Sequence, residues 1–94
     1  MIGLAQGAGL DAIVTTTLDS GIGVAVALHL AATLPPPMRH CGLATALLLE
    51  GSLLVHPPSI TGGQMRVPDR PGLGVALDDD QLARYGDGWH EVRY

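Results

Sequence analysis

The sequence has no lysine and no phenylalanine, and its 94 residues include a single cysteine, Cys41. Without lysine, the chain cannot supply the amine base that many proton-abstracting enzymes use. A lone cysteine excludes an internal disulfide and favours a cytoplasmic protein. Only 15% of the residues are charged and the five arginines do not cluster, so the positive patch of a nucleic-acid-binding protein is absent.

Long apolar runs are also missing. The longest, residues 22–34, is interrupted by His29 and ends at three prolines, short of the roughly 20 residues that span a membrane. The N-terminus has no basic segment ahead of an apolar one, so we expect no secretory signal. Neither nucleic acid nor membrane is therefore expected as a partner.

What remains is unusually apolar for so short a chain. Hydrophobic residues make up 47% of the sequence, the mean hydropathy is +0.30 and the net charge is −4. An independent small domain usually carries nearer a quarter charged residues, and it buries only about 60–65% of its unfolded surface. The composition predicts a segment that belongs to a larger hydrophobic core.

The most informative stretch joins a strand to a helix without a spacer. Residues 12–17 are mostly β-branched, which favours a buried strand, and a helix is predicted over residues 20–34. Asp19 or Ser20 is expected to cap that helix. Hydroxyl groups at the end of a strand, beside a helix N-terminus, suit an anion such as a carboxylate.

The other predicted elements follow the order helix, strand, helix, strand, helix, which is typical of βα units around a parallel sheet. From His56 onward the chain is rich in proline, glycine and polar residues. We therefore expect a tail that wraps around the rest of the fold and contributes little to its core. The remaining predictions are a helix ending at Gly9, a strand over 41–45, a helix over 46–54, an extended piece over 64–67, a helix over 78–85 with Asp78 and Gln81 at capping-box spacing, and an edge strand over 90–93.

Metal ligation is weakly supported. His40 beside Cys41 lacks the spaced partners of a zinc site, and the acidic residues 78–80 lack a glycine-turned cation loop. His29, alone among apolar residues, is expected to be a hydrogen-bonded core or rim residue, and Glu50 is expected to face solvent. No metal ligand is predicted in this chain.

Two motifs resemble the last two βα units of the enolase superfamily barrel. They are Thr-Thr-Thr-Leu-Asp-Ser-Gly-Ile-Gly at residues 15–23 and Gly-Leu-Ala-Thr at residues 42–45. Within the muconate-lactonizing subgroup the motifs are most similar to o-succinylbenzoate synthase. The tail at residues 63–78 resembles the segment that returns to the capping domain. The resemblance implies an α/β fold in which residues 1–94 form part of a C-terminal TIM-barrel domain, with the last βα units in 1–55 and the returning tail in 56–94.

The resemblance also implies a reaction and its limits. The family's synthase is a Mg²⁺-dependent carbon–oxygen lyase of menaquinone biosynthesis, in which lysine removes a proton α to a carboxylate. This chain has no lysine and no matching set of metal ligands. It is therefore expected to be inactive alone and to need the missing barrel and capping-domain segments as partners.

Five residues carry the site that the resemblance implies. Thr15 and Gly42 map onto positions that surround the substrate's carboxylate, where a hydroxyl and a glycine N–H can donate hydrogen bonds. Thr16, Asp19 and Ser20 are expected to fix the turn and cap the helix. No catalytic residue is expected among these 94 residues.

Other functions stay open. The resemblance also leaves N-acylamino acid racemases, dipeptide epimerases and muconate cycloisomerases open, because the same scaffold hosts several reactions that start from one proton abstraction. The small residues at 42–45 favour the synthase, because racemase-like and cycloisomerase-like members usually place a carboxylate or histidine near that strand end. A third hypothesis is a small autonomous α/β interaction module.

Overall fold

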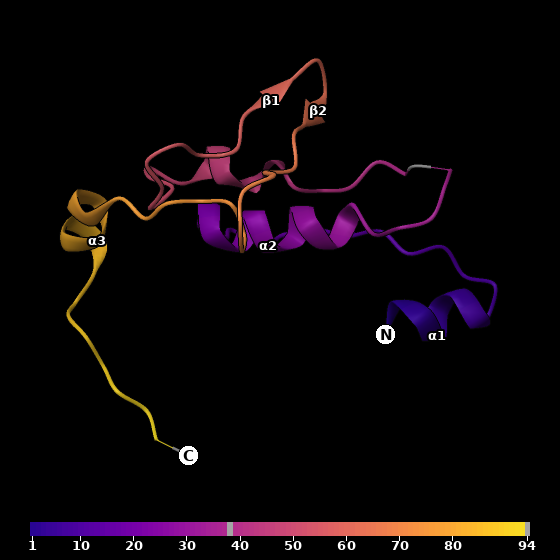
Figure 1. Ribbon diagram of the computed structural model, residues 1–94, viewed down its shortest axis with the longest axis horizontal. Coiled ribbons are helices and arrows are strands. Elements are labelled where there is room, and N and C mark those ends of the chain that lie inside the picture. Colours follow the sequence, from indigo (N-terminus) through magenta and orange to yellow (C-terminus); the bar gives the residue numbers. More distant parts are fainter. Residues whose placement is uncertain (38, 94) are drawn as a thin grey trace.

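The computed structural model describes residues 1–37 and 39–93, and α2 lies at its centre (Figure 1). The α1 and α3 helices lie toward opposite ends, and a two-stranded hairpin projects beside α2. In chain order the elements are α1 (Ile2–Gly7), α2 (Gly21–Ala31), the 3₁₀ helix η1 (Ala44–Leu48), β1 (Ile60–Thr61), β2 (Gln64–Met65) and α3 (Asp79–Tyr85).

The two strands predicted before α2 and before η1 lie side by side and run parallel, as the βα reading requires. Their pairing is limited to one bridge, between Thr15 and Gly42. The predicted strand over 41–45 is cut short because Ala44 already begins η1. Residues 11–17 nevertheless alternate strictly between exposed and half-buried, which is the period of a strand covered on one face. The strand was predicted to be buried, whereas one of its faces is exposed in this structure.

Two helix predictions also need correction. The α2 helix ends at Ala31 rather than at residue 34, because the N–H groups of Thr33 and Leu34 bond carbonyls only three residues back, just before the three prolines. The helix predicted over 46–54 is absent. Its place is taken by η1 and then by an extended segment that begins after Leu53, whose φ is 65°.

Glycine conformations set the turns. Gly9 has a φ of 75°, and the N–H of Leu10 bonds the Ala5 carbonyl at 2.9 Å, which confirms the predicted helix stop. Gly62 and Gly63, with φ of 59° and 74°, join β1 to β2 as a two-residue hairpin turn. The extended piece predicted over 64–67 is confirmed as β2, but its partner β1 was missed. The structure shows no strand over 86–93, so the predicted edge strand was wrong.

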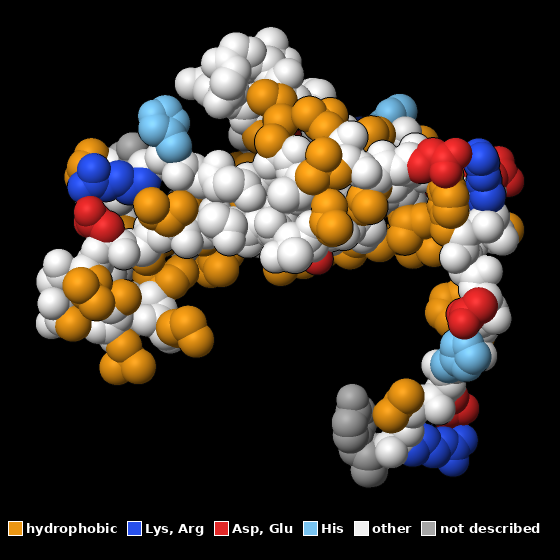
Figure 2. Space-filling view, turned by 180° about the vertical axis from the view of Figure 1, so that it is seen from behind, with side chains coloured by type: hydrophobic (Ala, Val, Ile, Leu, Met, Phe, Trp, Pro, Cys, Tyr) orange, Lys and Arg blue, Asp and Glu red, His pale blue; other side chains and the backbone are white. Residues whose placement is uncertain are grey.

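The core is small for the length of the chain. Its buried hydrophobic residues come from α2, the segment before η1 and the segment after it: Val24, Ala25, Leu28, Leu43 and Leu54. The accessible surface is 7475 Å², against about 5,100 Å² expected for a folded monomer of this mass. Figure 2 shows hydrophobic side chains spread over one face of this surface. Within residues 1–37 and 39–93, no helix has the length and apolar character needed to cross a membrane.

Leu54 connects the tail to α2. It forms an antiparallel bridge with Leu77, and its side chain lies where a Cβ on Gly21 would fall, 2.6 Å from its Cδ1 atom. Gln81 secures the same segment, because its Oε1 atom accepts a hydrogen bond from the Leu53 N–H at 2.8 Å. The start of α3 is thereby attached to the core.

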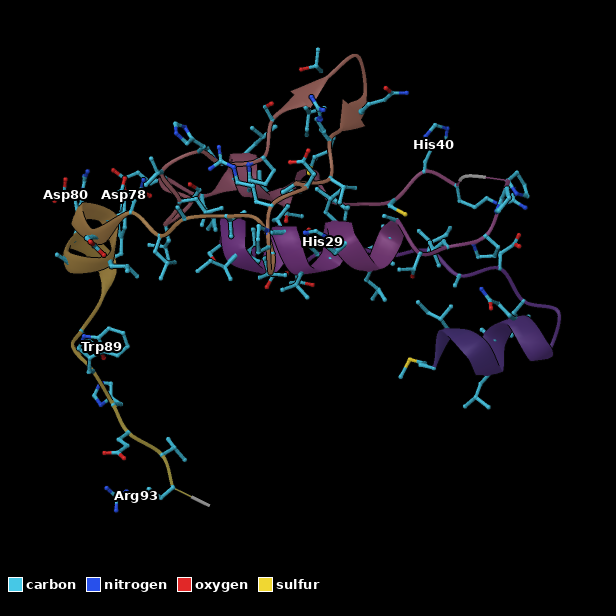
Figure 3. All side chains as sticks on the ribbon, in the orientation of Figure 1. His29, His40, Asp78, Asp80, Trp89 and Arg93 are labelled. Carbon is cyan, nitrogen blue, oxygen red and sulfur yellow. The ribbon has the colours of Figure 1, made fainter. Side chains whose placement is uncertain are left out.

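Asp78 caps α3, as its spacing from Gln81 predicts. Its Oδ1 atom accepts hydrogen bonds from the N–H groups of Asp80 and Gln81, and the Gln81 amide donates to Oδ2 at 3.0 Å. The side-chain bond from Gln81, followed by the backbone bond from Gln81, lowers the pKa of Asp78 below its usual value. Figure 3 shows Asp78 and Asp80 together at the start of α3.

Asp78→Ala is expected to destabilise the chain more at pH 7 than at pH 3. A carboxylate with a lowered folded-state pKa stabilises the fold above its unfolded pKa of about 3.9, and this contribution is lost as the pH falls through the folded pKa. Urea unfolding at both pH values measures the difference. Asp79→Ala is the matched control, because Asp79 lies in the same first turn but accepts no cap hydrogen bond. An equal loss at both pH values would contradict the role of the ionised cap.

Candidate functional site

Thr15 and Gly42 lie against each other on the open face of the paired segments. A Cβ atom placed on Gly42 would lie 3.1 Å from the Cγ2 methyl of Thr15 and 3.5 Å from its Cβ atom. Both residues are exposed. The structure therefore brings together the two residues that the sequence motifs singled out, although they are far apart along the chain.

The backbone N–H of Gly42 was expected to be available to a substrate, but it already donates a hydrogen bond within the protein. It donates to the Val14 carbonyl at 3.0 Å, and the Gly42 carbonyl accepts from the Thr16 N–H at 2.9 Å. The parallel bridge occupies both polar groups of Gly42. The expectation that this N–H is available to a substrate was wrong, and the contribution of Gly42 at this position is the space that its missing side chain leaves for Thr15.

Thr16 points to the opposite, half-buried face. Its hydroxyl lies 2.6 Å from the hydroxyl of Thr45 and donates to the Gly42 carbonyl at 3.3 Å. Thr45 was not predicted as a site residue, although a threonine at the end of the second motif is the signal that identifies it. This hydroxyl pair fastens the two strand ends together and so holds Thr15 over Gly42.

The turn before α2 differs from the prediction in its caps. Ser20 occupies the N-cap position, but no hydrogen bond from its side chain caps the helix, and the Gly21 N–H instead donates to the Ser52 carbonyl at 2.8 Å. The Asp19 carboxylate accepts from the Thr17 N–H at 3.1 Å. Asp19 thus fixes the turn, as expected, but neither residue caps α2, because a backbone carbonyl from another segment takes that role.

The same turn contains one strained residue. Leu18 has a φ of 35°, which is unfavourable for a residue with a side chain. On the following turn of α2, a Cβ atom on Gly23 would lie 2.8 Å from the Cβ atom of Asp19, so only glycine fits there. Strained turns that the surrounding structure holds in place are common at functional sites.

The donor set at the strand ends does not fit a magnesium ion. Over residues 1–37 and 39–93, no three histidine, cysteine or acidic side chains come together to form a metal site. Mg²⁺ prefers carboxylate oxygens, whereas the groups around Thr15 are hydroxyls, and the nearby Asp19 carboxylate is engaged with the Thr17 N–H.

Hydroxyl groups are the main polar side-chain groups at the two strand ends. The Thr15 hydroxyl can donate one hydrogen bond to an anionic oxygen, and the surrounding hydroxyls carry no charge. Since the chain has no lysine, the amine base of the predicted chemistry is absent. At these strand ends the Thr15 hydroxyl is thus an uncharged hydrogen-bond donor, with no lysine beside it.

Two further side-chain predictions are confirmed outside the strand ends. The Nε2 atom of His29 lies 2.9 Å from the Leu73 carbonyl, and Figure 3 shows the ring on α2, where this contact ties the helix to the tail. Glu50 is exposed and pairs with Arg84 at 3.2 Å. Neither residue belongs to the strand-end site.

Parallel strand ends followed by helices, with the candidate binding groups at their carboxyl ends, define part of an α/β barrel. The family model described as "Enolase C-terminal domain-like" matches residues 1–81. The chain therefore belongs to the enolase C-terminal domain-like family.

Several curated proteins that are similar in sequence to this chain are cycloisomerases. The chain is 38% identical over 82 residues to a chloromuconate cycloisomerase from Pseudomonas putida and 33% identical to muconate cycloisomerase 1 from the same organism. Each match covers 87% of this chain and 22% of the relative. The chain thus spans about a fifth of the length of these relatives.

Solved structures agree with the sequence matches. The muconate lactonizing enzyme from Klebsiella pneumoniae aligns with a TM-score of 0.80 at 35% identity, covering 88% of this chain and 23% of that one. The enzyme from Pseudomonas fluorescens complexed with muconolactone aligns with the same TM-score at 32% identity, covering 88% and 22%. The predicted fold class, the C-terminal part of an enolase-superfamily barrel, is confirmed.

Proposed function

We propose that this chain forms the carboxylate-binding wall of a muconate-cycloisomerase-type enzyme. The observation that carries the proposal is the contact of Thr15 with Gly42 at two paired strand ends, in a chain whose relatives are muconate and chloromuconate cycloisomerases. Those relatives are named for muconate and chloromuconate, which are dicarboxylates, so a carboxylate of such a substrate is the proposed ligand of this wall. The proton-transferring groups and the Mg²⁺ ligands of the enzyme lie outside these 94 residues.

The exposed surface supports an assembly with further barrel segments. Large hydrophobic side chains that a lone domain would bury are open, among them Leu4, Ile13 and Leu47 at 81%, 57% and 81% exposure. Ile13 lies on the same face as Thr15, since the two are separated by one residue of extended chain. In the proposed enzyme this face points into the barrel, and the tail after residue 55 runs toward the capping domain.

A chimera tests the proposal directly. The matching C-terminal segment of the P. putida chloromuconate cycloisomerase is replaced by residues 1–81 of this chain, and turnover of chloromuconate and muconate is followed by absorbance. We expect the chimera to retain cycloisomerase activity, whereas the 94-residue chain alone is inactive. The unaltered P. putida enzyme is the control. A folded chimera without activity toward either substrate contradicts the proposal.

An o-succinylbenzoate synthase is the second candidate. It is favoured by the small residues at the end of the second strand, where Gly42, Leu43 and Ala44 offer neither a carboxylate nor a histidine. The same chimera is assayed with the cyclohexadiene precursor of o-succinylbenzoate and with N-acylamino acids. Dehydration of the precursor in preference to lactonisation of muconate would support the synthase, and racemisation would support the N-acylamino acid racemases.

A further inference from the structure

The arginines of the chain fall into two groups. Arg39, Arg84 and Arg93 pair with the carboxylates of Asp11, Glu50 and Glu91 at 2.8, 3.2 and 3.1 Å. For Arg66 and Arg70, the part of the chain that the structure describes contains no ion-pair partner. In a chain of net charge −4, they are the two arginines for which the described residues provide no ion pair.

Both arginines line one cavity in the tail. The cavity has a volume of about 400 Å³ and lies between residues 56–59 and residues 66–74, which places it outside the strand ends that hold Thr15. His56 lines it beside the two arginines, and Asp69 is the carboxylate in its lining. The volume lies in the range of small-molecule sites, and the arginines outnumber the carboxylate.

The cavity is an open depression, and three prolines contribute to its lining. Pro57, Pro58 and Pro68 line it, and a Cβ atom on Gly74 would lie 2.5 Å from the Cβ atom of Pro68, so the loop closes tightly there. The carbonyl of Leu73 is fastened to α2 by the ring of His29 at 2.9 Å. Because proline restricts the backbone, the backbone of this loop has less conformational entropy to lose when a ligand binds, although the exposed arginine side chains still have to be ordered.

We propose that Arg66 and Arg70, in the cavity between residues 56–59 and 66–74, form a second binding site for a small oxyanion. The planar guanidinium group presents donors in a fork that matches the oxygens of a phosphate or a carboxylate, and it stays protonated at all physiological pH values. The Ser59 hydroxyl and the His56 ring add neutral hydrogen-bonding groups to the lining. This site is independent of the proposed cycloisomerase function.

Two sources could supply this chemistry, a phosphate group and a dicarboxylate. Isothermal titration calorimetry of the 94-residue chain with inorganic phosphate and, separately, with succinate distinguishes them. We expect saturable binding of at least one of the two, weakened about tenfold by Arg66→Gln and by Arg70→Gln, since each variant removes a charge-assisted hydrogen bond. Arg84→Gln removes a paired arginine outside the cavity and is the matched control.

Each outcome bears on the proposal. Preferential binding of phosphate assigns the site to phosphorylated ligands, and preferential binding of succinate assigns it to dicarboxylates. Equal binding to the wild-type chain and to both cavity variants, or a loss as large in Arg84→Gln, overturns the site. Absence of saturable binding of either anion to the wild-type chain overturns it as well. Circular dichroism of every variant verifies that the two exposed substitutions leave the helices intact.

Discussion

Leu54→Ala is expected to destabilise the chain by about 2–5 kcal/mol, the cost of removing a fully buried leucine and leaving a cavity. Leu54 is 1% exposed and contacts the start of α2, while its backbone pairs with Leu77 of the tail. One residue therefore links the two segments, with its side chain against α2 and its backbone against the tail. Since a domain of this length has a free energy of unfolding of only about 5–14 kcal/mol, the loss is a large fraction of the total.

Urea unfolding followed by circular dichroism measures this loss. Leu47→Ala is the matched control, because Leu47 is the same residue type at 81% exposure and its replacement is expected to change the free energy of unfolding by less than about 0.5 kcal/mol. Similar losses in the two variants would show that Leu54 does not connect the two parts of the chain.

Gly42→Val is expected to lower kcat/KM of the chimeric enzyme by about 100-fold, as a displacement of a positioning group by 1 Å can do. A Cβ at this position already lies 3.1 Å from the Thr15 methyl, and valine adds two further methyl groups. The added side chain would clash with Thr15 and displace its hydroxyl, which is proposed to bind the substrate carboxylate. Steady-state kinetics with chloromuconate measure the effect.

A rescue experiment separates this contact from general damage. Gly42→Ala is expected to cause a smaller loss, and Thr15→Ser to restore part of it, because serine lacks the Cγ2 methyl that the new Cβ meets but keeps the hydroxyl. The double variant and both single variants form a cycle that isolates the interaction of the two positions. Strict additivity of the two substitutions would refute the proposed contact.

The sequence was most informative where a local signal and the fold agree. The glycine stop after α1 and the Asp78 cap of α3 were both predicted, since each depends on residues within one turn. Of the strand predicted over residues 12–17, the structure shows one parallel bridge, at Thr15. The division of the chain at residues 55 and 56 stays a prediction. So does the cytoplasmic location inferred from the single cysteine.

Predictions failed where a distant segment decided the local structure. Residues 46–54 have helix-compatible side chains, but Leu53 and Leu54 pair with the segment that precedes α3, which requires extended backbone. At the start of α2 the Ser52 carbonyl takes the place of a capping side chain. Such long-range hydrogen bonds leave no pattern within a short window of sequence.

At the candidate site, too, the residues could be predicted from local motifs, whereas their long-range hydrogen bonds could not. The motifs identified Thr15 and Gly42, and the structure places them in contact. The loss of the free Gly42 N–H could not be predicted, because the hydrogen bond to Val14 depends on which residues of the two strands stand opposite each other. Thr45 became visible only through its contact with Thr16.

The large accessible surface of the folded chain also governs how it unfolds. An unfolded chain of this mass exposes about 14,000 Å², so a fold that already exposes 7475 Å² uncovers about a quarter less on unfolding than a compact monomer would. The dependence of stability on urea concentration scales with that newly exposed area. The isolated chain should therefore unfold over a broad range of urea concentration, and contact with further barrel segments would sharpen the transition.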